Sequence, residues 1–462
     1  MPSIPYLSSL AATSLLLSAS ASQAKASAPP KYLFGTTCLP GPLQPSSFNL
    51  TTTPSCAPSS GDPPPWHPFT ARPYCLPKTD YCIFTHAGFH GSDRGLSVID
   101  VRPYAITTED TVVDNDDEVS RTAVTAVADM LVSASLSGAL EPLPDLFSPE
   151  AASSSSSSSS SATTTTTAEK TTREPTSEEP DSKNLPYELR DLPNKGKGLI
   201  ATRPIPRGRI FMIDYPAVLA DTKLPRHVKQ AQGRELMAEA IGRLSTRGRE
   251  EVLGLARQNE DEERKKRVPV SEDVMKTNSF VVEVQGREYM ALFPKIARMN
   301  HACKPSAVTR FNSTTLSNTA MAFRDILPGE EITISYSTFG LPSTIRQQNL
   351  LSGWGFTCTC DLCTSPPADL AASDKRREKV SRLGQEVIEL VSRGRKEDMQ
   401  QAVALYSEAV EAVDEEGLVP HLGGHYEVLG RLWGAAGEVE KGREWAQRGR
   451  EETEMFERAA MG

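Results

Sequence analysis

Apolar and polar residues change their pattern several times along this chain of 462 residues. From Tyr187, short apolar segments punctuated by Gly and Pro predict β-strands. A charge-rich stretch at about 220–280 interrupts them with helical spacing, and a helix is expected after Leu341 up to Trp354. At 369–456 apolar residues recur at helical spacing and predict an array of paired helices. The expected strand segments are YELRDL, GLIATR, RIFMIDYPAVL, FVVEV, REYMALF, SAVTRF, TAMAFRDI and EITISY.

The chain ahead of these strands divides into three segments. Residues 1–24 hold the apolar run LSSLAATSLLL followed by small residues, which is the layout of a secretory signal peptide, although no Lys or Arg precedes the run. An Ala/Ser-rich disordered tail is the alternative. Residues 25–150 form a Pro-rich, Cys-containing N-terminal module in which GLSVI predicts a short buried strand. Residues 151–184, with long Ser and Thr runs, predict a disordered linker because they cannot bury enough apolar surface.

Composition excludes several classes of protein. Acidic residues (59) outnumber basic ones (50), so a protein that coats nucleic acid is not expected. No run of about 18 or more apolar residues occurs, so no membrane-spanning helix is expected. Eight cysteines in 462 residues are too few for a disulfide-stapled scaffold.

The cysteines fall into two sets of four, on either side of the Ser/Thr-rich segment. If the chain is secreted, the early set most simply forms two disulfides, for which three connectivities exist. Cys75 and Cys82 flank the turn-like segment LPKTDY and are candidates to pair across it. Four unpaired thiols in a loosely folded region are the alternative. The early set is Cys38, Cys56, Cys75 and Cys82.

The late cysteines predict a metal site. Cys358, Cys360 and Cys363 lie within six residues, and structural zinc takes four ligands in a tetrahedron. Cys303 is the nearby candidate for the fourth ligand. Adventitious cysteines or disulfides are the alternative, but three cysteines this close cannot all pair locally.

Four other features carry little information singly. Gly196, Lys197 and Gly198 form a Gly-x-Gly turn that opens a strand, where the backbone can approach a ligand closely, or simply an ordinary hairpin turn. Asn300 and His301 follow an apolar segment, where a lone histidine is more often structural than functional. Tyr336, at the end of the strand EEITISY, and Phe356, just before the cysteines, would each be read as a core aromatic.

The order of these motifs is specific. Gly-x-Gly, Asn-His-x-Cys-x-Pro, Gly-Glu-Glu-(apolar)-Thr-(apolar)-x-Tyr and Cys-x-Cys-x-x-Cys together resemble the SET-domain protein lysine methyltransferases with a zinc-binding post-SET segment. The branch with the SET-and-MYND proteins and fungal SET proteins with helical C-terminal repeats is the most similar. The resemblance implies a mixed α+β chain: a β-rich SET fold of short curved sheets with a knot-like core at 185–340, a post-SET zinc segment at 341–366, and a TPR-like helical region at 367–462.

The resemblance also implies an S-adenosylmethionine-dependent enzyme that methylates a lysine of a protein substrate. Gly196, Lys197 and Gly198 match the loop that wraps this cofactor, and Asn300 and His301 match the pair that contacts it and helps form the knot-like core. Tyr336 matches the catalytic tyrosine at the methyl-transfer channel, and Phe356 matches the aromatic that covers the adenine. The matching zinc ligands are Cys303, Cys358, Cys360 and Cys363.

The sequence departs from the family pattern at two positions beside the expected cofactor site. Ala302 replaces the usual serine, and Ser306 replaces the asparagine that usually follows the proline. The alternative function is therefore a weak or inactive SET protein that acts as an interaction module, with a partner on the helical array. No MYND-type cluster interrupts the SET region. The basic run at 264–267 resembles a nuclear import signal, but a solvated helix face is the favoured interpretation.

The two ends of the chain predict different compartments. The signal-like N-terminus, the sequon at Asn49 and four early cysteines favour the secretory pathway. Zinc-bound thiolates and S-adenosylmethionine favour the cytoplasm or nucleus, which is the alternative. A second sequon at Asn312 falls in an expected strand region, where a glycan would obstruct folding.

Overall fold

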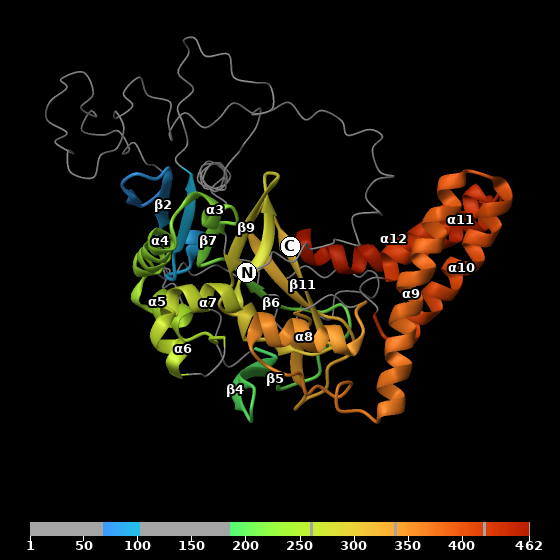
Figure 1. Ribbon diagram of the computed structural model, residues 1–462, viewed down its shortest axis with the longest axis horizontal. Helices are drawn as coiled ribbons and strands as arrows, with labels where there is room; N and C mark the ends of the chain where they lie inside the picture. Colours follow the sequence, from blue (N-terminus) through green and yellow to red (C-terminus); the bar gives the residue numbers. More distant parts are fainter. Residues whose placement is uncertain (1–67, 102–184, 259–261, 337–339, 419–421, 462) are drawn as a thin grey trace, which may run out of the picture.

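The computed structural model describes residues 68–101, 185–258, 262–336, 340–418 and 422–461 (Figure 1). Three β-sheets and their covering helices form one part of the molecule, and long helices extend from it. The expected mixed α+β class is confirmed. The signal-like segment, the Ser/Thr-rich linker, Cys38, Cys56 and the sequon at Asn49 lie outside the described residues.

The largest sheet joins segments that are far apart in the sequence. Strand β3 pairs in parallel with β7, whereas every other pair in this sheet is antiparallel. The sequence-based division into an N-terminal module and a SET region therefore separates strands that the structure joins, and the strand expected at GLSVI is β3. In spatial order the strands are β1 (Ala71–Cys75), β2 (Tyr81–His86), β3 (Leu96–Val101), β7 (Val218–Asp221), β9 (Arg287–Leu292) and β8 (Phe280–Val284).

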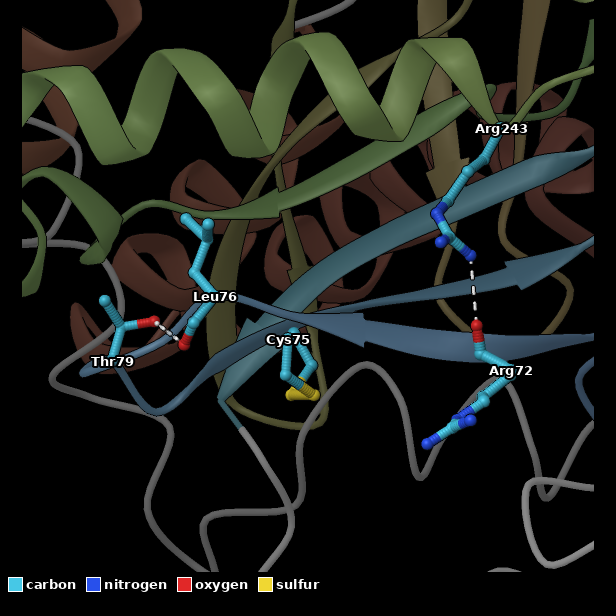
Figure 2. The surroundings of a disulfide bond; sticks show 6 residues. Arg72, Cys75, Leu76, Thr79 and Arg243 are labelled. Carbon is cyan, nitrogen blue, oxygen red and sulfur yellow. Dashed lines mark hydrogen bonds between the residues drawn. A yellow bond between two sulfur atoms is a disulfide. The ribbon is translucent and has the colours of Figure 1, made fainter. Parts of the chain in front are cut away.

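A disulfide closes the hairpin at the edge of this sheet. Cys75 lies opposite Cys82 in the β1–β2 pair, and the two form a disulfide (Figure 2). The Arg243 guanidinium donates a hydrogen bond of 3.0 Å to the carbonyl of Arg72, which ties the hairpin to the end of a covering helix. The sequence allowed three disulfide connectivities for the early cysteines. The structure has the one that pairs Cys75 with its near neighbour Cys82.

Two smaller sheets complete the β-rich part. All of their strands except the two-residue β10 overlap the segments expected from sequence, with ends that differ by up to a few residues. The four-stranded sheet has the order β10 (Asn300–His301), β13 (Glu331–Ile334), β5 (Gly196–Ala201) and β4 (Tyr187–Leu192). The three-stranded sheet has the order β11 (Ala307–Asn312), β12 (Ser317–Ala322) and β6 (Ile210–Asp214).

Side chains of the large sheet point alternately to its two faces, and both faces are covered. Leu219 faces a core shared with the two smaller sheets, whereas Val218 and Ala220 face the helices of the insert. The insert expected at about 220–280 is confirmed as helical. Its helices are α3 (Leu224–His227), α4 (Gln230–Gly242), α5 (Thr246–Leu253), α6 (Glu262–Arg267) and α7 (Val270–Asn278).

The sequon at Asn312 ends strand β11 rather than lying within it. The Asn312 side-chain oxygen accepts hydrogen bonds from the backbone N–H groups of Thr314 (2.8 Å) and Thr315 (3.2 Å). The half-buried carboxamide therefore shapes the β11–β12 turn, and a glycan there would have to break these bonds.

The helices after the strands form the expected array. In Figure 1, α12 runs from the array back towards β11, and the Arg207 guanidinium in the β-rich part pairs with Glu452 of this helix at 2.6 Å. The helix lengths of 27, 20, 14 and 23 residues are unequal, and a TPR-type repeat stays a prediction. None of the described helices has the length and apolar character needed to cross a membrane. The helices are α8 (Ser343–Trp354), α9 (Pro367–Arg393), α10 (Lys396–Glu415), α11 (Leu422–Ala435) and α12 (Val439–Met461).

Candidate functional site

Four cysteine sulfurs converge between the β-rich part and the helical array. Their Sγ atoms all lie within 4.8 Å of one another, and the Sγ atoms of Cys303 and Cys363 are 3.6 Å apart. A tetrahedral zinc with sulfur ligands at about 2.3 Å separates its sulfurs by about 3.8 Å. Three of the thiols are buried and Cys363 is half-buried. The structure therefore gathers the ligand set expected from sequence, Cys303, Cys358, Cys360 and Cys363, in a geometry that fits zinc.

The electrostatics of this cluster also favour a cation. Hydrogen bonds from the neighbouring thiols, that of Cys358 first, lower the pKa of the Cys303 thiol below its ordinary value. Four thiolates this close would repel one another strongly without a positive ion between them. A bound zinc ion supplies that charge and keeps all four sulfurs deprotonated.

His301 connects this cluster to the aromatic residues beside it. Its Nδ1 atom accepts the backbone N–H of Tyr336 at 2.9 Å, and its Nε2 atom lies 3.4 Å from the Cys303 sulfur. Because Nδ1 is an acceptor, the proton of a neutral ring sits on Nε2 and points to the sulfur. Both ring nitrogens thus have partners within the protein, and any cofactor contact of His301 falls to its backbone or ring carbons.

Tyr336 lies two residues beyond strand β13, half-buried between the core and the cysteines. Its hydroxyl donates a hydrogen bond of 2.8 Å to the carbonyl of Met299. Burial, with a smaller contribution from the Glu331 carboxylate, raises the pKa of this phenol above its ordinary value. The hydroxyl is therefore protonated at neutral pH and held in one orientation.

Phe356 completes an aromatic group around Tyr336. The Phe356 ring centroid lies 6.4 Å from those of both His301 and Tyr336. Trp354, which the sequence analysis did not identify, lies closer, with its centroid 5.2 Å from that of Tyr336. Its indole N–H donates to the carbonyl of Thr277 at 2.9 Å, which fixes the ring. In the sequence, a tryptophan at the end of a helix cannot be told apart from an ordinary core residue.

The Gly-x-Gly segment lies at the start of β5, beside Asn300. A Cβ added to Gly198 would lie 2.5 Å from the Leu192 Cδ1 atom and 2.7 Å from the Asn300 amide nitrogen, so a larger residue would push these side chains away from the strand. Gly196 adopts φ +69° and has open space where a Cβ would be, and Lys197 between them is exposed. The backbone at Gly196 is therefore accessible to a ligand.

Asn300 is held by an ionic pair that the sequence analysis also missed. The Asn300 amide donates to one oxygen of Glu331 at 2.9 Å, and the Lys195 ammonium binds the other oxygen at 2.7 Å. This chain of contacts joins the β4–β5 turn, β13 and β10. In the sequence, Glu331 is one of two adjacent acidic residues after a turn, which is an ordinary surface pattern.

The two departures from the family pattern fit their surroundings. The Ser306 side chain is fully buried, and its hydroxyl accepts the backbone N–H of Thr333 at 2.9 Å. The Ala302 backbone N–H donates to the carbonyl of Ile334 at 3.0 Å. Neither residue distorts the segment that carries His301 and Cys303.

Comparison with known proteins identifies the β-rich part. The model of the SET domain matches residues 196–337. N-lysine methyltransferase SMYD2 of Homo sapiens is 32% identical over 102 residues, which are 22% of this chain and 23% of that protein. Histone-lysine N-methyltransferase set5 of Schizosaccharomyces pombe is 30% identical over 205 residues, which are 42% of this chain and 56% of that protein. The chain thus spans about a quarter of the first relative and just over half of the second.

Proposed function

We propose that this chain, which carries a SET domain at 196–337, is an S-adenosylmethionine-dependent protein-lysine N-methyltransferase with a structural zinc site. The observation that carries the proposal is the position of Tyr336. Its hydroxyl is fixed by Met299, its backbone by His301, and its ring lies beside Phe356 and the four cysteines. Both relatives are named as lysine methyltransferases, which supports the same reaction.

The chemistry requires a neutral lysine amine. The amine has an ordinary pKa of about 10.4, and an apolar channel lowers that pKa by desolvation. When bound, S-adenosylmethionine supplies a methyl group on a positively charged sulfur. The amine nitrogen takes the methyl as the carbon–sulfur bond breaks, after the amine proton has left to solvent. The chain contributes mainly by holding the amine in line with the methyl group.

Tyr336 is the residue to which we assign this orienting role. Its phenol stays protonated and is fixed on the Met299 carbonyl, so its oxygen lone pairs point to a constant place. The aromatic rings of Trp354 and Phe356 flank it and reduce its contact with water. Removal of water strengthens the electrostatic contacts of the amine there.

The residues proposed for the cofactor lie along one sheet. Gly196, Lys197 and Gly198 begin β5, and Asn300 and His301 form β10. The accessible backbone at Gly196 is suited to close approach by a ligand, whereas Gly198 lies close to the side chains of Leu192 and Asn300. Phe356, which follows α8, is proposed to cover the adenine. The knot-like crossing of this region stays a prediction.

The alternative function is an interaction module without catalysis, in which the helical array binds a partner. Ala302 and Ser306 motivate this alternative. Their undistorted surroundings favour the enzyme, because the nearby His301 and Tyr336 contacts are all present.

Calorimetry of S-adenosylmethionine binding to the zinc-loaded full chain separates the two functions. Saturable binding supports the enzyme, and a folded, zinc-loaded protein that does not bind contradicts it. Transfer is then measured by mass spectrometry on histones and on a pool of lysine-containing peptides. The histones are included because the name of the fission-yeast relative specifies them.

For the compartment, we propose entry into the secretory pathway, with the cytoplasm or nucleus as the alternative. The disulfide of Cys75 and Cys82 supports an oxidising environment. The zinc cluster is compatible with it, because metal-bound thiolates are occupied by the ion. Mass spectrometry of the native protein tests the proposal: a mature N-terminus near residue 25 supports it, and an intact residue 1 with reduced Cys75 contradicts it.

A further inference from the structure

Two buried arginines contact the backbone and side chain of one cysteine in the cluster. Arg346 of α8 donates from Nε to the Cys303 sulfur at 3.3 Å. Its side chain is 1% exposed, and its Nη2 atom is buried without a hydrogen-bond partner among the described residues. Its Nη1 atom donates to the carbonyl of Leu341 and lies 3.4 Å from Asp374. A buried guanidinium with an unused N–H group is costly unless a negative group lies beside it.

Arg377 of α9 binds the backbone of the same cysteine. Its Nη2 atom donates to the Cys303 carbonyl at 3.1 Å and to Glu416 at 3.0 Å. Both Arg377 and Glu416, which directly follows α10, are almost completely buried. Ser373 and Arg376 also bind the Glu416 carboxylate, so α9 and the end of α10 are joined at this point.

The charges agree with a metal-loaded cluster. A zinc ion with four thiolates carries two net negative charges, and placing them in a buried site is unfavourable unless cations lie nearby. Arg377 shares the Glu416 carboxylate with Arg376 (2.9 Å) and Lys304 (3.8 Å). Arg346 pairs with the more distant Asp374, which is 20% exposed, and donates directly to the Cys303 sulfur. Arg346 is therefore the buried cation that lies against the sulfurs themselves.

We propose that Arg346 is a positioning residue of the zinc site, and that the Arg377–Glu416 pair extends the site to α9 and α10, so that zinc binding and docking of the helical array stabilise each other. This inference rests on the zinc site of the proposed function. The reciprocity follows from thermodynamic linkage: if docked helices raise the affinity for zinc, bound zinc raises the stability of docking by the same factor.

The first test measures zinc loss from the full chain to an excess of a chromophoric chelator. Removal of an outer-shell partner commonly weakens metal binding by about 10–100-fold, so Arg346→Gln should lose zinc about 10–100 times faster than the wild type. Arg346→Lys keeps the positive charge, and its rate of zinc loss should lie between those of the wild type and Arg346→Gln. Arg382→Gln is the matched control, because Arg382 is an exposed arginine of α9 whose ion pair is with Glu386 in the same helix. It should leave the rate unchanged.

Cobalt-substituted protein gives a signature that a general loss of packing would not. The thiolate-to-cobalt absorption band should shift in Arg346→Gln, since the sulfur loses an N–H donor, and should not shift in Arg382→Gln. A zinc-loss rate within about twofold of wild type, or an unchanged cobalt band, overturns the proposal for Arg346.

The coupling between zinc binding and docking of the helical array is tested on the wild type alone. This test remains possible if Arg346→Gln does not fold. After zinc removal, hydrogen exchange should accelerate in α9 and α10 but not in β8 and β9, whose buried residues belong to other core clusters than the four cysteines. Equal exchange with and without zinc in α9 and α10 overturns the coupling. A wild-type chain that binds no zinc contradicts the metal site itself, whereas failure to methylate lysine leaves these readouts untouched.

Discussion

The Nδ1 atom of His301 accepts the backbone N–H of Tyr336 at 2.9 Å. This bond sets the tautomer of the ring and directs its other N–H towards the sulfur of Cys303, 3.4 Å away. The proposed catalytic tyrosine and a proposed zinc ligand are therefore joined through one side chain. Loss of the metal should disturb Tyr336 even though no metal contacts it.

Tyr336→Phe should abolish measurable methyl transfer while leaving S-adenosylmethionine affinity within about threefold of wild type. The substitution removes only the hydroxyl that orients the amine, and misorientation of this kind costs about 100-fold or more in rate. Steady-state transfer and calorimetry provide the two readouts. Tyr406→Phe is the control, because Tyr406 bonds His425 in the helical array, away from the site. Full activity of Tyr336→Phe would disprove the role assigned here.

His301→Asn should separate the two bonds of the ring. The asparagine carbonyl can replace Nδ1 as the acceptor for Tyr336, but its side chain is too short to reach Cys303. We expect zinc loss about 10-fold faster than wild type, with cofactor affinity of the zinc-loaded form largely kept. His301→Ala should lose both. The prediction fails if the two variants release zinc at the same rate as wild type.

Asp100 should make stability depend on pH in the weakly acidic range. Burial raises its pKa to about 6, even though the Arg287 guanidinium and the Tyr289 hydroxyl oppose this shift. The folded state therefore holds a proton that the unfolded state releases near its ordinary pKa of 3.8, and the free energy of unfolding falls as pH rises from about 4 to 6. The full effect is up to about 3 kcal/mol.

Chemical denaturation at several pH values measures this dependence. In Asp100→Asn the free energy of unfolding should fall less between pH 4 and 6 than in the wild type, because the amide does not titrate. Asp191→Asn, which changes an exposed carboxylate of β4, should keep the wild-type slope. An Asp100→Asn profile parallel to wild type would contradict the assignment.

Gly430→Ala should destabilise the helical array. A Cβ at Gly430 of α11 would lie 2.8 Å from the Gly442 carbonyl of α12, and relieving such overpacking costs about 1–3 kcal/mol. Gly424→Ala, also in α11, meets nothing within 4 Å and should be neutral or stabilising by about 0.5–1 kcal/mol. Thermal unfolding followed by circular dichroism compares them. Equal unfolding temperatures for the two variants would contradict close helix packing.

Sequence pattern predicted the local elements but not their long-range partners. Short apolar segments identified the strands around Leu219 and Val98, yet such a segment does not state which strand lies beside it. The β3–β7 pair was therefore missed, and the N-terminal residues were taken as a separate module. For the candidate site, motif order identified Tyr336 and the cysteines. Arg346 and Glu331 were missed because a lone charged residue in a helix or turn looks like solvated surface until the fold buries it.

The parallel β3–β7 pair joins Ile99 to Ala220 across more than a hundred residues of chain. A protease cut between these strands would break the chain without breaking the sheet, so both fragments should stay together through native chromatography and separate only in denaturant. For the same reason, expressing residues 185–462 alone would leave β7 as an exposed edge strand ready to pair with other molecules. A fragment that keeps this sheet intact around the proposed active site therefore has to begin upstream of residue 68.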